Sequence, residues 1–342
     1  MIAAALRGRR AQNGVRPFDP YRDLGPVAEL IVTAFGGKLD PAGQVMLEKM
    51  CRGARWGPLL VWLYWPGWSS AAVAPGFVWT EEGRVVGNVS LRRALGWGGF
   101  LIGNVAVHPN WQGRGIARAL MEAVLEEILA RGGRWAGLEV QAGNQQAHRL
   151  YEHLGFRDVG RTLHMLRPAG LPWAGNSTPH PSLRRGHSHD SEALIELVRA
   201  IVPESHRPLL RLPRADYQLG WERTLDCWLR GRREVWWVAE EGGAVRGAVR
   251  ALHERGRCPD RLEVLVVPEH GGCFETVLVQ QGLTSLRGAS KKTVETVLPS
   301  PTEPLIAALE AAGFQRLRLL VQMRLDIRSD QVHFLTNRSS ML

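Results

Sequence analysis

The sequence is poor in cysteine, and the cysteines that it has are not paired. Cys51, Cys227, Cys258 and Cys273 are the four in 342 residues, and no two of them form a Cys-x-x-Cys motif. This argues against a disulfide framework and indicates a reducing compartment. His270 lies three residues before Cys273, but two ligands do not make a zinc site. We therefore expect no bound metal.

Long apolar runs are also missing. Charged residues or glycines interrupt every hydrophobic stretch before it reaches the length of a membrane span. At the start of the chain a short apolar run precedes Arg7, Arg9 and Arg10, which reverses the order found in a secretory signal. We expect a cytoplasmic protein without a membrane partner.

Positive charge is plentiful but is not concentrated. The formal net charge is +10, and the arginines are spread along the whole chain. A nucleic-acid-binding protein would gather them on one face, so we expect no nucleic-acid partner. The hydrophobic content of 45% and charged content of 22% are those of a globular chain, long enough here for two domains.

The apolar patterns of the first half predict alternating strands and helices. Strands are expected at residues 14–17, 77–79, 85–91, 101–107, 135–140 and 156–165, and helices at 24–35, 40–52, 116–130 and 144–154. Tryptophans 56, 62, 65 and 68 either fill the core or line an acceptor pocket, and the sequence leaves both readings open. Residues 167–182, rich in Pro, Gly, Ser and Thr, predict a linker.

The second half of the chain echoes the first at a shift of about 160 residues. Six positions of the 78–89 region recur with the same residue types: Val78, Glu81, Gly83, Val85, Gly87 and Val89 match Val238, Glu241, Gly243, Val245, Gly247 and Val249. We therefore predict a tandem duplication. The expected domains are 1–166 and 183–328, followed by a tail at 329–342.

A glycine-rich turn in the first half is the strongest motif. The stretch Gln112-Gly113-Arg114-Gly115-Ile116-Ala117 follows a strand and opens a helix. Unpaired amides and the helix dipole make such a turn an anion site, and glycine lets a phosphate approach the backbone.

This stretch, together with Arg149-Leu150-Tyr151-Glu152-His153-Leu154-Gly155-Phe156, resembles the GNAT family of acetyl-CoA-dependent acyltransferases. The resemblance implies an α/β (α+β) fold with two tandem GNAT-like domains, each a mixed, mostly antiparallel twisted sheet flanked by helices. It covers the first domain well and the second weakly.

The resemblance also assigns roles to individual residues. Tyr151 would be the general acid, and Glu139 the general base through water, as in the N-terminal alanine acetyltransferases of ribosomal proteins. His108 and His148 are alternative bases. Coenzyme contacts are expected from the strand Val105, Ala106 and Val107, from the turn Gln112, Gly113, Arg114, Gly115, Ile116, Ala117 and Arg118, and from Asn144 and Tyr151.

The second domain has lost these groups. Phe274 stands at the position of Gly115, and Leu309 at that of Tyr151. We expect acetyl transfer from acetyl-CoA to a primary amine, either a peptide N-terminus or a small molecule, by direct attack in a ternary complex. A non-catalytic acetyl-CoA sensor or scaffold is the alternative. A homodimer is left open, and the acceptor is not readable from the sequence.

Overall fold

The computed structural model describes residues 13–35, 76–94, 98–171, 182–210, 212, 214–256, 258–286 and 292–327. The chain divides into two compact units. Unit 1 comprises Met1–Glu139, Gln146–Arg157 and Met323–Leu342, and unit 2 comprises Val140–Gln145 and Asp158–Gln322. The predictions for the 40–52 helix, the tryptophans at 56–68, most of the linker and the tail at 329–342 lie outside the described residues.

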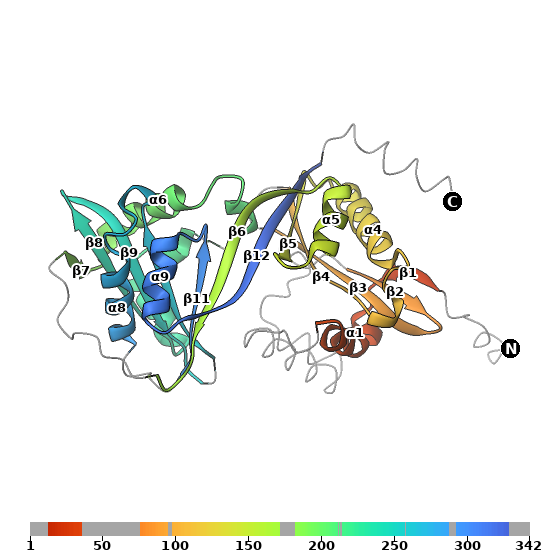
Figure 1. Cartoon of the computed structure of the whole chain (residues 1–342), viewed down its shortest axis with the longest axis horizontal. Coiled ribbons are helices and arrows are strands. Elements are labelled where there is room, and N and C mark those ends of the chain that lie inside the picture. Colours follow the sequence, from red (N-terminus) through yellow and green to blue (C-terminus); the bar gives the residue numbers. More distant parts are fainter. Residues whose placement is uncertain are drawn as a thin grey trace. The chain divides into compact units, whose positions relative to one another are not determined.

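In the first half of the chain the strands pair in the order β1-β2-β3-β4-β5 (Figure 1). Neighbouring strands are antiparallel except β4 and β5, which are parallel. The elements are β1 Gly14–Pro17, α1 Pro20–Phe35, β2 Phe77–Glu81, β3 Arg84–Arg93, β4 Gly99–Val107, the 3₁₀ turn η1 Pro109–Trp111, α4 Ile116–Ala130, β5 Trp135–Gln141 and α5 Gln145–His153.

The described elements of the first half recur in the same order in the second half, after β6 Arg157–Arg167, with further short helices among them. They are β7 Leu183–Arg185, η2 Ser188–Asp190, α6 Ser191–Ile201, η3 Arg207–Leu209, η4 Arg214–Tyr217, α7 Trp221–Leu229, β8 Arg233–Glu241, β9 Ala244–His253, β10 Asp260–Val266, η5 Pro268–His270, α8 Glu275–Ser285, β11 Val294–Pro299, α9 Glu303–Ala311 and β12 Gln315–Asp326. Its sheet order is β12-β6-β11-β10-β9-β8-β7. The structure thus confirms the predicted α/β fold and the mostly antiparallel sheet flanked by helices.

Several predicted boundaries match the observed ones. The strand at 14–17 and the helix at 116–130 have the expected bounds. The first helix begins earlier than predicted, at Pro20, because the Asp19 side chain accepts a hydrogen bond from the Tyr21 amide at 2.9 Å. Proline at the first position of a helix needs no amide partner, so this start is well formed.

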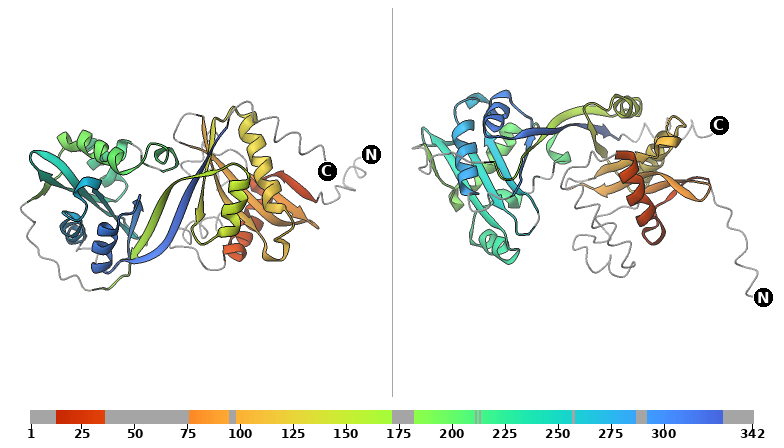
Figure 2. Two further views of the ribbon diagram at one scale, coloured as in Figure 1. Left: turned by 45° about the horizontal axis from the view of Figure 1, so that its top comes forward. Right: turned by 60° about the horizontal axis from the view of Figure 1, so that its bottom comes forward.

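Both halves place helices on the two faces of their sheet (Figure 2). In the first half α1 packs on Val78, while α4 lies over Gly87 on the other face. A Cβ at Gly87 would come within 2.9 Å of the Ile116 and Leu120 side chains, and one at Gly247 within 2.9 Å of Leu278. Glycine at these matched positions lets α4 and α8 approach their strands closely.

An arginine–aspartate ion pair occurs in both halves, although matching the two halves by sequence did not find it. Arg16 forms a bidentate pair with Asp23 at 2.6 Å, and Arg184 forms one with Asp190 at 2.8 Å. In both cases the buried aspartate also accepts a backbone N–H at 2.8 Å, from Asp19 or from His187. The spacing differs by one residue between the halves, which hides the match from a fixed-shift comparison. This repeated contact strengthens the case for duplication.

Strand β6 follows the first half in sequence, but most of it belongs to unit 2. Its residues 162–167 pair antiparallel with β11, from Thr162 opposite Pro299 to Arg167 opposite Val294. From the sequence we expected this strand to end the first domain. The boundaries at 166, 182 and 328 stay predictions.

Candidate active site

The turn predicted as an anion site is open and lined by backbone. Gly113 and Gly115 adopt φ values of 77° and 78°, in the left-handed region that favours glycine. Apart from the adjoining residues, no atom of the described part of the chain lies within 4 Å of where a Cβ would stand on either glycine. Both residues and the intervening Arg114 are exposed. A ligand can therefore reach the main chain of this turn.

Helix α4 begins at this turn with free amides. Gly115 is its N-cap and provides no side-chain cap, and the first helical hydrogen bond runs from the Ala119 amide to the Gly115 carbonyl at 3.0 Å. The amides of Ile116, Ala117 and Arg118 thus precede the intrahelical ladder. Together with the positive end of the helix dipole, they favour an anion at this point.

Hydrogen bonds from the end of β4 fix the shape of the turn. The His108 amide donates to the Val86 carbonyl at 2.9 Å, and the Trp111 amide donates to the His108 carbonyl at 2.8 Å. The Gln112 side chain donates to the Val107 carbonyl at 3.1 Å. The Gln112 side chain therefore connects the turn to β4. The backbone of Gln112 is the part that is left for an anion.

Strand β4 parts from β5 halfway along its length. The parallel register runs from Gly99 opposite Trp135 to Ile102 opposite Leu138, although β4 continues to Val107. From Phe100 to Ile102 the residues are buried, whereas Gly103 and Asn104 are exposed. The second half of β4 therefore offers a strand edge to a ligand, through Val105 and its neighbours.

A bulge accompanies this separation, and the sequence reading did not find it. Asn104 has a φ of 50°, and the β3–β4 register shifts opposite it, between Asn88 and Ser90. The buried Asn88 side chain donates to the Asn104 carbonyl at 3.0 Å. Asparagine tolerates the left-handed region better than most residues, which is the signal that could have marked Asn104. Such bulges re-aim strands beside functional sites.

Tyr151 lies on α5 and is 5% exposed. Its ring packs edge-on to Phe156 with the centroids 6.2 Å apart. Burial raises the pKa of Tyr151 to about 12. Within the described part of the chain its hydroxyl forms no hydrogen bond, so at neutral pH it is a protonated donor not committed to a described partner.

The other predicted polar residues occupy the expected elements. Glu139 on β5 is exposed between the buried Leu138 and Val140, as strand alternation predicted. Asn144 directly precedes α5, and its amide donates to the Gln141 carbonyl at 2.8 Å. Glu139 therefore remains a candidate base.

The two histidines considered as alternative bases have structural contacts. His108 Nδ1 accepts from the Asn110 amide at 3.3 Å, and its ring packs against Trp111 at 4.9 Å. His148 Nδ1 lies 3.4 Å from Glu152, one helical turn away. Both contacts stabilise local structure.

The corresponding turn of unit 2 is filled by its own chain. Both Glu275 carboxylate oxygens accept from the Gly272 amide at 2.9 Å, and Oε2 also accepts from Phe274 at 3.2 Å. Glu275 is 2% exposed, and Phe274, the N-cap of α8, is 8% exposed. A protein carboxylate thus holds the place where an external anion would bind.

The sequence profile of the Acetyltransferase (GNAT) family matches residues 45–156. This region spans the open turn, the parted strands and Tyr151. It is a GNAT acetyltransferase domain.

Curated relatives match a short part of this chain. The [ribosomal protein bS18]-alanine N-acetyltransferase of Escherichia coli (strain K12) is 46% identical over 56 residues, which are 16% of this chain and 38% of the relative. The mycothiol acetyltransferase of Nocardiopsis dassonvillei is 48% identical over 52 residues, 15% of this chain and 16% of the relative. The chain thus spans well under half of these relatives.

Solved structures resemble the whole chain in fold. A GCN5-related N-acetyltransferase from Sphaerobacter thermophilus has a TM-score of 0.62 at 18% identity and covers 92% of this chain and 95% of its own. A tandem GNAT protein from the clavulanic acid biosynthesis pathway has a TM-score of 0.55 at 20% identity, covering 91% and 98%. These likenesses support a tandem arrangement of the fold.

None of the described helices is long and apolar enough to cross a membrane. No group of three or more His, Cys, Asp or Glu side chains arranged to hold a metal ion occurs among the described residues.

Proposed function

We propose that the GNAT domain transfers acetyl from acetyl-CoA to a primary amine. The observation that supports this most is the turn from Gln112 to Gly115. It is exposed, it has two left-handed glycines, and no other described residue fills the space above them. The comparable turn in unit 2 is occupied by Glu275. An open turn beside a parted strand is what a phosphate-bearing coenzyme requires.

The residues present fit the coenzyme at two points. The amides from Gly113 to Arg118 would hold the pyrophosphate. The part of β4 that continues beyond its pairing with β5, at Val105, Ala106 and Val107, would pair through its backbone with the pantetheine amides as an added strand does. Asn144 would hydrogen-bond the same arm. These contacts orient the thioester and leave its carbonyl free for attack.

The chemistry then needs two proton transfers. The amine nitrogen attacks the thioester carbonyl, the new C–N bond forms, and the C–S bond breaks. Glu139, acting through water, would take the proton that the amine loses. Tyr151 would donate its O–H proton to the departing sulfur, because burial keeps its hydroxyl protonated at neutral pH. A backbone amide of β4 would polarise the carbonyl.

Direct attack in a ternary complex is favoured over a covalent acyl-enzyme. The sequence has no cysteine between residues 52 and 226, so the described part of the GNAT domain offers no thiol to accept the acetyl group. Initial-rate patterns that intersect, instead of running parallel, would support this order.

The acceptor is a peptide N-terminus or a small-molecule amine. One curated relative acts on a ribosomal-protein alanine and another is a mycothiol acetyltransferase, so both classes occur among similar proteins. We favour the peptide N-terminus, because Glu139, Asn144 and Tyr151 have the spacing seen in the ribosomal-protein enzymes.

Thiol release from acetyl-CoA with a panel of amines tests the proposal. The panel holds peptides with N-terminal alanine, the same peptides with a blocked N-terminus, and small amines. Turnover with free but not blocked peptides supports the peptide reading. Tight acetyl-CoA binding without turnover on any amine would instead support a coenzyme-binding sensor.

A further inference from the structure

A cavity of about 600 Å³ lies in unit 2 between helix α7 and the start of β8. Three stretches of the chain contribute its lining: residues 185–188 at the end of β7, residues within 219–228 in and before α7, and residues 232–236 in and before β8. None of these residues takes part in the proposed acetyl transfer. A volume of this size is typical of sites for small organic molecules.

The cavity lies where β7 leaves the edge of β8. Strand β7 pairs with β8 from Trp237 to Ala239, and the Gly186 amide donates a further hydrogen bond to the Trp236 carbonyl at 3.0 Å. Strand β8 itself begins at Arg233. Residues 233–235 therefore have no described strand beside them on this side. Helix α7 and the residues after β7 enclose the cavity along this stretch.

Tryptophan side chains give the cavity flat apolar walls. Trp221 and Trp228 line it from α7 and are each 74% exposed, while Trp236 lines it from β8 and is 5% exposed. Trp221 and Trp228 are about two helical turns apart, which places both rings on one side of the helix. The exposed Leu225 and Leu229 of the same helix do not line the cavity. Exposed indole rings offer a stacking surface to another aromatic ring.

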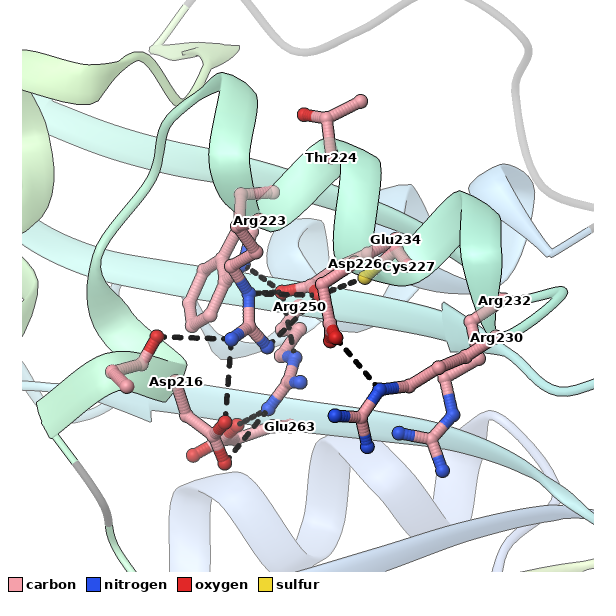
Figure 3. Close-up of polar contacts among 12 residues, drawn as sticks. Asp216, Arg223, Thr224, Asp226, Cys227, Arg230, Arg232, Glu234, Arg250 and Glu263 are labelled. Atoms are coloured by element: carbon pink, nitrogen blue, oxygen red, sulfur yellow. Dashed lines mark hydrogen bonds and ion pairs between the residues drawn. The ribbon is translucent and has the colours of Figure 1, made fainter.

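The charge around the cavity is positive. Its lining includes four arginines and a single carboxylate, that of Glu234. The protein already compensates this carboxylate, because Arg223 lies 2.9 Å and Arg250 3.0 Å from it (Figure 3). Although burial raises the pKa of Glu234, Arg250 and Arg223 outweigh burial and lower it overall, so the carboxylate stays charged and paired. Glu234 therefore does not offset the positive charge of the remaining arginines.

Two of the lining arginines have no carboxylate partner. Arg233 and Arg185 are exposed, and neither forms an ion pair with another described residue. The Arg185 guanidinium lies 4.6 Å from the centroid of the Trp237 ring. Arg232, by contrast, is paired with Glu254 at 3.2 Å. The N–H donors of Arg233 and Arg185 thus remain available to an external acceptor.

We propose that this cavity binds a small organic acid that carries a flat aromatic ring. The ring would stack on Trp221 and Trp228, and the acid group would accept hydrogen bonds from Arg233 and Arg185. Arginine matches the geometry of a carboxylate with two parallel donors. The aromatic walls exclude water from the ion pair, which strengthens it.

An acidic peptide is the competing occupant, and the open edge of β8 fits it less well. A peptide that adds a strand pairs along several residues, and typical strands are about five or six residues long. At this end β8 extends past β7 by residues 233–235 alone. The cavity therefore suits a molecule of one or two rings better than an extended chain.

Isothermal titration calorimetry of the full chain, with 2-naphthoate as the probe, tests the proposal. We expect one site per chain with a Kd of about 10⁻⁵ to 10⁻⁴ M, which weakens as salt is added. Two matched probes separate the contributions of charge and ring. The neutral 2-naphthamide lacks the charge and cyclohexanecarboxylate lacks the aromatic ring, so each should bind at least ~10-fold more weakly.

Neighbouring residues of α7 provide a matched pair of variants for the ring contact. Trp228→Gln removes a wall of the cavity, and we expect it to weaken 2-naphthoate binding at least ~10-fold. Leu229→Gln is the control, because Leu229 is 69% exposed on the same helix but does not line the cavity. It should leave the Kd unchanged. Circular dichroism checks that each variant is folded, and Trp221→Gln serves as a second probe if Trp228→Gln is not.

A second pair of variants tests the charge. Arg233→Gln should weaken 2-naphthoate binding about tenfold and leave the binding of 2-naphthamide unchanged. Arg261→Gln is the control. Arg261 is also exposed and forms no ion pair with a described residue, but it lies on β10 and does not line the cavity.

Four results would overturn the proposal. The full chain could fail to bind 2-naphthoate at concentrations well above the expected Kd. The amide could bind as tightly as the acid, which would make the cavity a purely apolar site. Trp228→Gln and Leu229→Gln could lower the affinity equally. Finally, a short polyglutamate peptide could bind, and lose affinity in Arg233→Gln, while 2-naphthoate does not bind, which would assign the cavity to an acidic peptide.

Discussion

The turns that open α4 and α8 occupy the same place in the repeat but differ in what meets their amides. Each follows a strand and a 3₁₀ turn, and each has its N-cap at the matched position, Gly115 or Phe274. Before α4 no side chain caps the helix. Before α8 the Glu275 carboxylate accepts hydrogen bonds from the amides of Gly272 and Phe274.

The difference shows that a side chain can close such a turn while the strand–turn–helix fold is kept. Amides at a helix start need a hydrogen-bond acceptor, and in unit 2 the first residue of the helix provides an anionic one. In unit 1 the amides stay available to the coenzyme that we propose.

A similar difference between the two units is found in the next helices, α5 and α9. Tyr151 on α5 corresponds to Leu309 on α9, and both are buried. The leucine fills core volume and cannot exchange a proton, whereas the tyrosine keeps a hydroxyl with a raised pKa. Unit 2 has therefore kept a buried side chain at this position but has no hydroxyl there.

The largest expected effect comes from copying the closed turn into the open one. Gly115→Phe puts a side chain on a residue with φ of 78° and into the space above the amides. We expect acetyl-CoA binding to weaken by at least ~100-fold, with roughly 1–2 kcal/mol of backbone strain. Isothermal titration calorimetry measures the loss.

A glycine at the other end of α4 provides the control. Gly132 has φ of 69° and open space around it, so Gly132→Phe imposes similar strain without obstructing the turn. It should retain binding. If both variants bind acetyl-CoA as the wild type does, the open turn is not the coenzyme site.

The next largest effect should come from Tyr151→Phe. Removal of the hydroxyl takes away the proposed acid, and we expect kcat to fall about 100-fold with little change in coenzyme affinity. Steady-state thiol release measures kcat, and titration measures affinity. Tyr217→Phe, which alters the buried tyrosine of unit 2 that donates to Glu263 at 2.6 Å, should leave kcat unchanged. An unaffected rate in Tyr151→Phe would remove it as the acid.

The sequence predicted most of the first unit because its signals are local. Helical spacing and the glycines on both sides of α4 set its bounds, and Glu82-Gly83, with φ values of 49° and 79°, forms the expected hairpin turn. Glu139 and Tyr151 could be found because a motif fixed their spacing.

What the sequence could not supply depends on contacts between distant segments. The pairing of β6 with β11 joins residues more than a hundred positions apart. The bulge at Asn104 depends on Asn88 from another strand. The contact that closes the second turn is local, but it depends on a rotamer of Glu275 that the sequence does not specify. The sequence showed that Phe274 replaces glycine, but it did not show that the Glu275 carboxylate accepts hydrogen bonds from the amides of this turn.

Glu275→Gln should have a smaller effect, confined to unit 2. The amide keeps the size of the side chain but removes the charge that meets the helix start, so we expect a loss of about 1–2 kcal/mol in unfolding free energy. Urea denaturation measures this loss. Acetyl-CoA should still bind with one site per chain. A second site appearing in calorimetry would show that the closed turn is a latent coenzyme site held shut by its carboxylate.

The smallest expected effect is spectroscopic and concerns the titration of Tyr151 at high pH. Because burial raises the pKa of Tyr151 to about 12, its phenolate absorbance near 295 nm should appear well above the value of about 10 for an exposed tyrosine. The difference between wild type and Tyr151→Phe isolates this titration. The raised pKa also means that the stabilising contribution of the protonated form is complete below pH ~10 and is lost as the pH rises toward 12. A difference spectrum centred near 10 would place the hydroxyl in water, and Tyr151 would then not be buried at its hydroxyl.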